Sequence, residues 1–215
     1  MDKLPFKERV AQAANTFAPK YQSVFVDYEY LLCSDAFSAQ DYYIISAKED
    51  NFRHLLGVHT ELTPGSFFQK CIKGELTAND FDFQKPGESE KAVKGTVRRK
   101  INAFPSFLAM MSKDLVVQEK FEKNNVICTI ATTDCESTTG FINSTKLRPK
   151  TLLNGDWIDR EEAGTVDLIL RRPAGSDLFN EIITEHNSAL IKYFPKIKSI
   201  LSPDIYPDKG DKVTA

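Results

Sequence analysis

Short strand-like runs follow one another through the second half of the chain, and they constrain its fold more than any other feature. Each run is rich in β-branched or apolar residues, and turn residues separate the runs at short intervals. This spacing is typical of an antiparallel meander. The runs cover 115–117, 126–131, 139–142, 151–153 and 166–170.

Helical periodicity marks the segments that surround these strands. The longest of them has one continuous apolar face, and Pro105 is expected to kink it or to split it in two. Pro19 is expected to close the first helix, and Gly74 to end the second. The predicted helices cover 5–18, 63–72, 88–112 and 177–194.

These elements predict an α+β fold in which antiparallel β-sheet packs with flanking helices. A strand over 23–32 and its partner over 42–47 form an expected hairpin ahead of the second helix. We expect residues 1–215 to form a single domain. Its parts are an N-terminal helix (1–20), a core (22–172) with the inserted helix 88–112, a C-terminal helix (173–202) and a flexible tail (203–215).

Composition narrows the class of protein. The chain has 215 residues and is 41% hydrophobic, which is enough for one well-filled domain. Its net charge is -2, so contact with nucleic acid would depend on a local basic patch.

None of the four cysteines has a cysteine or histidine at metal-ligand spacing, and we expect neither a metal nor a cofactor. No signal peptide or membrane span is recognisable, so a cytoplasmic location without a membrane partner is expected.

The segment 48–58 places three candidate catalytic side chains close together. Lys48, Arg53 and His54 follow a strand-like run and lead into an apolar turn that ends in glycine. Cations can neutralise a developing phosphorane, and histidine can transfer a proton near neutral pH, so this set suits phosphodiester cleavage without a metal. Two plainer interpretations stay open. His54 could be a structural histidine bonded to a carbonyl, and the two cations could be solvated partners of neighbouring carboxylates.

The long predicted helix carries the only concentrated basic surface in the sequence. Lys91, Lys94 and Arg98 follow i, i+3, i+7 spacing, and Lys100 lies beside them. This stripe would attract a phosphate backbone if it lined the same cleft as His54. Otherwise it is the solvent-facing side of a helix.

The two other histidines receive no catalytic role. His59 is expected at the surface. His186 falls on the apolar side of the last predicted helix and is expected in the core.

Several short motifs follow in a particular order after the hairpin. They are His54-Leu55-Leu56-Gly57-Val58, Phe67-Phe68-Gln69-Lys70-Cys71, Gly95-Thr96-Val97-Arg98-Arg99-Lys100-Ile101, the meander and Pro149-Lys150-Thr151-Leu152-Leu153. This order resembles a family of phage and mobile-element proteins from low-GC Gram-positive bacteria, over roughly 24–172. Those proteins are classed with the Barnase–EndoU–colicin–RelE-like (BECR) nucleases. The resemblance implies a BECR-like nuclease core over 22–172.

The resemblance also implies which residues form a site. The family's histidine ahead of a Leu-x-Gly turn corresponds to His54, and its preceding polar or basic residue to Lys48 or Arg53. Its basic residue in the long helix corresponds to Arg98 or Lys100.

A final family segment, Pro-x-Thr/Ser-Leu-Leu, corresponds to Lys150 and Thr151. These residues could orient a phosphate through a hydroxyl hydrogen bond. They could equally end one strand and start the next.

Together these observations predict a metal-independent ribonuclease acting on tRNA or mRNA. The 2′-hydroxyl would attack phosphorus, with His54 as general base or acid and with Lys48, Arg53 or the basic helix stabilising the phosphorane. The substrate-binding candidates are Lys91, Lys94, Arg98, Lys100, Lys150 and Thr151. The alternative is a non-catalytic phage or mobile-element protein that binds nucleic acid or a host or immunity protein. A third possibility is a structural or host-interaction protein whose basic helix docks an acidic partner.

Overall fold

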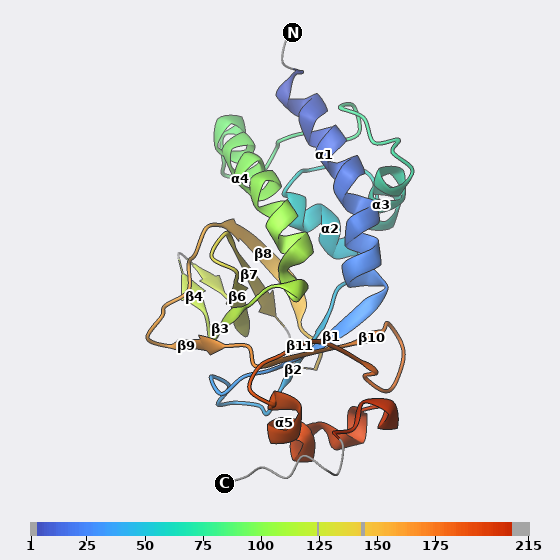
Figure 1. Cartoon of the computed structure of the whole chain (residues 1–215). Helices are drawn as coiled ribbons and strands as arrows, with labels where there is room; N and C mark the ends of the chain where they lie inside the picture. Colours follow the sequence, from blue (N-terminus) through green and yellow to red (C-terminus); the bar gives the residue numbers. More distant parts are fainter. Residues whose placement is uncertain (1–3, 124, 143–144, 208–215) are drawn as a thin grey trace.

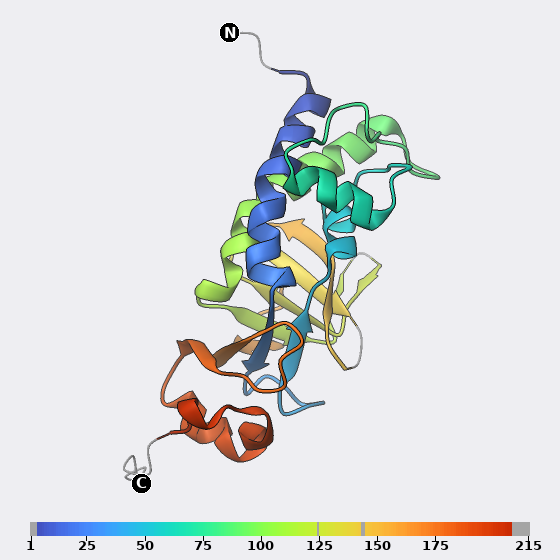
Figure 2. The ribbon, with the colours of Figure 1, turned by 90° about the vertical axis from the view of Figure 1, so that its right-hand side faces the viewer.

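The computed structural model describes residues 4–123, 125–142 and 145–207, and these form the predicted α+β architecture. Helices gather at one end, antiparallel sheets lie in the middle, and a further helix covers the other end (Figure 1). The same order is visible after a quarter turn (Figure 2), so the molecule is elongated. Within the described ranges, no helix is both long and apolar enough to cross a membrane.

Four helices form the N-terminal end of the fold. They are α1 (Phe6–Tyr21), α2 (Glu49–Leu56), α3 (Pro64–Ile72) and α4 (Glu90–Ala109). Buried aromatic rings join them: Tyr21, Phe52 and Phe68 contact one another with centroids between 5.2 and 5.9 Å apart. Phe104 of α4 meets Phe52 at 5.5 Å. Rings at such distances stabilise a core beyond the effect of burial alone.

A five-stranded antiparallel sheet packs against these helices. In spatial order its strands are β8 (Arg148–Asn154), β7 (Ser137–Ile142), β6 (Ile130–Thr133), β3 (Val116–Glu119) and β9 (Ala163–Thr165). The first four form the predicted meander, and β9 pairs with the free side of β3. Helices α2 and α4 both contact β8. A separate short hairpin joins β4 (Glu122–Lys123) to β5 (Val126–Ile127).

A second antiparallel sheet has four strands. In spatial order they are β11 (Glu181–Glu185), β10 (Leu168–Pro173), β1 (Tyr28–Cys33) and β2 (Tyr43–Ser46). Alternate residues of β1 enter different cores: Tyr30 and Leu32 join the core shared with the helices, while Leu31 and Cys33 join a second core with α5 (Ala189–Ile197). Burial on both faces explains why β1 is a continuous apolar run.

The start of the predicted strand over 23–32 is wrong. Gln22–Val26 forms a π-helical turn that continues α1, and Pro19 lies inside that helix rather than closing it. Phe25 stacks on Phe107 of α4 with ring centroids 4.5 Å apart. Packing against α4 therefore outweighs the strand propensity of this apolar run.

The predicted helix over 177–194 is also wrong. Its first half contains β11, and only its end enters α5. The β-branched residues at 182–184 favour a strand, and β10 offers them an edge with which to pair. His186 consequently lies in the connection after β11 rather than in the core, with its Nε2 3.3 Å from Asp114.

Three smaller predictions also change. The run 166–170 is not the last strand of the meander, because β10 pairs with β1 in the other sheet. Pro105 does not split the long helix in two, because α4 continues through it to Ala109. Of the predicted tail over 203–215, Pro203–Ile205 forms a 3-10 turn, and residues 208–215 lie outside the described chain.

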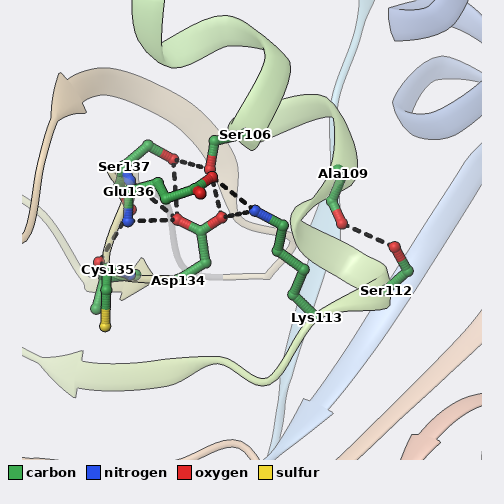
Figure 3. A network of polar contacts seen from close by, with 9 residues as sticks. Ser106, Ala109, Ser112, Lys113, Asp134, Cys135, Glu136 and Ser137 are labelled. Atoms are coloured by element: carbon green, nitrogen blue, oxygen red, sulfur yellow. Dashed lines mark hydrogen bonds and ion pairs between the residues drawn. The ribbon is translucent and has the colours of Figure 1, made fainter.

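A buried carboxylate fastens the end of α4 to the turn between β6 and β7 (Figure 3). The Asp134 side chain is 2% exposed. It accepts hydrogen bonds from the Ser106 hydroxyl, from Lys113 Nζ at 2.6 Å and from the Ser137 backbone N–H at 2.9 Å. Burial raises the pKa of Asp134, but the bonds from Lys113, Ser106 and Ser137 outweigh it and hold that pKa below its ordinary value.

Replacing Asp134 by asparagine should destabilise the fold by about 2 kcal/mol, because Lys113 loses its buried counter-charge and the Ser106 hydroxyl loses an ionised acceptor. Since the folded-state pKa of Asp134 is depressed, its contribution is present above the unfolded pKa of about 3.9 and is lost as pH falls through the folded value. Urea denaturation at neutral pH and at about pH 3 measures both effects. Equal stability of the two proteins at neutral pH would contradict this account.

Candidate functional site

A pocket of about 450 Å³ opens where the C-terminal end of α2 meets the middle of α4. Its third wall is the loop between α3 and α4. The lining residues are Arg53, His54, Gly57, Val58, His59, Thr60, Gln84, Lys85, Pro86, Glu88, Val93, Thr96 and Lys100. The pocket therefore gathers several cations and two histidines from segments far apart in the sequence.

His54 occupies the last turn of α2. The sequence predicts an apolar turn here, but the segment is a helix whose Phe52, Leu55 and Leu56 are buried along one side. His54 Nε2 lies 2.8 Å from the Lys150 carbonyl oxygen. Because a carbonyl only accepts, Nε2 carries the hydrogen in this bond, and Nδ1 of the neutral ring keeps its lone pair.

The electrostatic surroundings of His54 favour the neutral ring. Burial, the charge of Lys100 and the charge of Arg53 lower the pKa of His54, while the bond to the Lys150 carbonyl opposes that shift. The net direction is downward from the ordinary value. At neutral pH the His54 ring is therefore mostly neutral, with its lone pair on Nδ1.

Lys100 crosses the pocket from α4 to the end of α2. Its Nζ donates a hydrogen bond to the His54 carbonyl at 2.9 Å, where it satisfies one of the carbonyls left free at the helix end. The chain ends α2 with Gly57 in the left-handed region, at φ +79°. A Cβ at this position would lie 3.1 Å from Lys100 Cδ, so the glycine makes room for the lysine.

The amine of Lys100 is unusual in its ionisation. Burial, followed by the nearby charge of Lys85, lowers the pKa of Lys100 to about 8. The group stays largely protonated at neutral pH, yet it is poorly solvated there. A poorly solvated ammonium interacts strongly with an anion that enters the pocket.

The structure brings only some of the predicted site residues together. Arg53 lines the pocket beside His54, with its Nη1 donating to the Leu62 carbonyl at 3.4 Å. Lys48 precedes the first turn of α2, at the opposite end of the helix, where it lines a different pocket with Glu29. Its backbone N–H donates to Asn51 Oδ1 at 2.9 Å. Lys48 is thus separated from His54 by the length of α2.

The predicted basic stripe does not face the pocket. Lys94 pairs with Glu90 at 2.6 Å, Arg98 lies over the ring of Phe6, and Lys91 is exposed, so none of the three lines the cavity. The helical period explains this result. Lys100 is about 200° around the helix from Arg98, at roughly 100° per residue.

A different face of α4 forms the pocket wall. Val93, Thr96 and Lys100 follow i, i+3, i+7 spacing, and all three line the cavity. The helix therefore contributes Lys100 to the site and directs the predicted stripe elsewhere.

Lys150 and Thr151 support the site from β8. The Lys150 carbonyl holds the His54 ring, while its Nζ donates to the Ile127 carbonyl at 2.9 Å. The Thr151 methyl packs so closely on Gly140 that a Cβ there would lie 2.9 Å from it. Neither side chain lines the pocket.

No pattern in the sequence indicates that His59, Lys85 and Asp82 lie at this site. His59 Nδ1 lies 3.1 Å from Asp82 Oδ1, and the two residues also exchange backbone hydrogen bonds of 3.1 and 2.8 Å. Lys85 pairs with Glu88 at 2.5 Å at the pocket wall. No local periodicity signals these contacts, because the loop that carries Asp82 and Lys85 has none.

Among the described residues, no group of three or more His, Cys, Asp or Glu side chains is placed to hold a metal ion.

Comparison with known proteins gives one match. The model of the phage-Barnase-EndoU-ColicinE5/D-RelE like nuclease 4 family matches residues 16–146. No curated protein and no solved structure matches the chain. The matched range includes the end of α1, all of α2 to α4, the strands β1 to β7, and every residue that lines the pocket. Because the match extends over more than half of the chain, this protein belongs to the phage-Barnase-EndoU-ColicinE5/D-RelE like nuclease 4 family.

Proposed function

We propose that the protein is a metal-independent ribonuclease whose active site is the pocket around His54 and Lys100. The observation that carries the proposal is their pairing. A histidine with a free Nδ1 and a depressed pKa lies beside a poorly solvated ammonium. Membership of a nuclease family supports the reaction class. A pocket of about 450 Å³ also has room for a nucleotide-sized ligand.

The proposed reaction is an internal transesterification. Nδ1 of His54 takes the proton of the RNA 2′-hydroxyl, and that oxygen attacks the adjacent phosphorus. The bond from phosphorus to the 5′-oxygen breaks, and the products carry a 2′,3′-cyclic phosphate and a 5′-hydroxyl. DNA lacks the attacking hydroxyl, so the same chemistry selects RNA.

The cations of the pocket stabilise the transition state in this proposal. The Lys100 ammonium is directed at the negative charge that develops on the non-bridging oxygens, and Arg53 supplies a second charge at the same wall. Lys85, which is paired with Glu88, lies on the facing loop. A chain with a net charge of -2 thereby presents a local positive surface to a phosphate.

The pH dependence of cleavage should be bell-shaped for a nucleoside 3′-aryl phosphate, whose leaving group needs no proton. His54 must be neutral to accept a proton, so the rate rises as pH passes its depressed pKa, below about 6.5. Lys100 must be charged, so the rate falls as pH passes about 8. Values of kcat/KM measured in EDTA across this range test the prediction. Lys100→Arg should move the alkaline limb to higher pH because arginine stays protonated. A flat profile would contradict these assignments.

A second candidate is a binding protein of the same fold without catalysis. One observation favours it: His54 and Lys100 each make a hydrogen bond that fastens α2 to a neighbouring element. In that case substitution of either residue lowers the stability of the fold and the binding affinity in parallel. No chemical change of the RNA accompanies binding.

A further inference from the structure

His59 lines the same pocket as His54 and follows Gly57 by two residues in the sequence. The two histidines belong to different segments of the fold. His54 belongs to α2, whereas His59 lies in the extended segment that bridges to Asp82. Two histidines in one pocket allow a base and an acid to act on opposite oxygens of the same phosphate.

Asp82 fixes the orientation of the His59 ring. The distance from Nδ1 to Asp82 Oδ1 is 3.1 Å, and the carboxylate is itself held by the Gln84 backbone N–H at 2.8 Å. An ionised carboxylate only accepts, so Nδ1 of His59 carries the hydrogen of this bond. Nε2 is then the nitrogen that can carry a second proton and release it.

The charges around the two rings are opposite. His54 lies beside the cations Lys100 and Arg53 and bonds a neutral carbonyl. His59 contacts Asp82, and its Nε2 is 3.9 Å from Glu61. Pairs of titratable groups in such contrasting surroundings typically divide the acid and base roles between them.

We propose that His59 is the general acid of the reaction and that Asp82 is its positioning residue. The proposal rests on the proposed ribonuclease function. His59 Nε2 donates its proton to the 5′-oxygen as the bond from that oxygen to phosphorus breaks, while His54 Nδ1 holds the proton taken from the 2′-hydroxyl. One proton enters the protein at His54 and one leaves from His59, so the reaction conserves charge.

The structure also offers room for the departing nucleoside. A second cavity of about 600 Å³ adjoins the first and shares His59, Gln84 and Lys85 with it. It extends to Asp82 and Glu90. We place the nucleoside that leaves with the 5′-oxygen in this adjoining cavity, which puts its oxygen on the side of His59.

Two substrates with different leaving groups test this role. One is a short single-stranded RNA, whose 5′-alkoxide needs a proton to leave. The other is uridine 3′-(4-nitrophenyl phosphate), whose nitrophenolate leaves without one. His59→Ala should lower RNA cleavage on the order of 10²–10⁴-fold and leave cleavage of the aryl ester within a few-fold of wild type. His54→Ala should impair both substrates, and His186→Ala neither.

The outcomes separate this inference from the function beneath it. If His59→Ala cleaves RNA as fast as wild type, His59 is not the acid, although the ribonuclease stands. If the variant loses both substrates equally, its role is not leaving-group protonation, and the inference is overturned again. If wild-type protein cleaves neither substrate, the proposed ribonuclease function is wrong, and the role of His59 as general acid is wrong as well.

Discussion

Replacing His54 by alanine is expected to lower RNA cleavage on the order of 10²–10⁴-fold. The variant lacks the Nδ1 lone pair that accepts the 2′-hydroxyl proton in the proposed reaction. It also loses the bond from Nε2 to the Lys150 carbonyl. That bond is partly exposed, so its removal should cost only about 1 kcal/mol of stability. Initial rates on a fluorescent single-stranded RNA, together with urea denaturation, measure the two effects separately.

His186→Ala is the matched control, because it removes a histidine in the connection between β11 and α5 that makes no contribution to the pocket. The control should cleave RNA at the wild-type rate. A His54→Ala variant that keeps wild-type activity would remove His54 from the chemistry. A variant whose activity falls only in proportion to the folded fraction would make the residue structural.

Replacing Lys100 by methionine is expected to lower kcat on the order of 10²–10³-fold. Methionine fills much of the same space beside Gly57 but cannot stabilise a negative charge. Because Lys100 Nζ bonds the His54 carbonyl, the variant also leaves that carbonyl to water. A loss that appears in kcat indicates an interaction made in the transition state, whereas a loss in KM alone indicates substrate binding.

Lys20→Ala controls for the change in net charge, since Lys20 is an exposed residue near the end of α1 that does not line the pocket. It should leave kcat unchanged and affect cleavage only slightly at low salt. Equal effects of Lys20→Ala and Lys100→Met would reduce the role of Lys100 to general electrostatics. Lys100→Arg should retain more activity than the methionine variant if charge is what matters.

Much of the fold follows from local patterns in the sequence. Helices α3 and α4 have apolar faces of helical period, and Thr63 caps α3 through a bond from the Ser66 backbone N–H. The predictions failed where contacts with distant segments determine the local structure. The strand β11 exists because β10 offers a free edge, and the π-helical turn after α1 exists because Phe25 stacks on Phe107. No local pattern contains either partner.

The residues of the candidate site also differ in whether local sequence patterns indicate them. The proximity of His54 and Arg53 could be predicted, because they are neighbours in sequence and share the last turn of α2. Lys100 became a candidate because it belongs to a basic run in the sequence. The face of α4 that carries it to the pocket is not the face that carries the predicted basic stripe. His59 and Asp82 are 23 positions apart and meet through a backbone bridge. Their pairing depends on the tertiary fold and could not be seen in the sequence.

We propose that this pocket cleaves RNA by 2′-hydroxyl attack. The most direct test incubates the purified protein with total tRNA, a single-stranded RNA and a DNA of the same sequence, all in EDTA, and identifies the ends of any products. The account predicts cleavage of RNA alone, with 2′,3′-cyclic phosphate and 5′-hydroxyl ends, and no such products from His54→Ala. Cleavage of the DNA, loss of activity in EDTA, or identical products from the variant would contradict it.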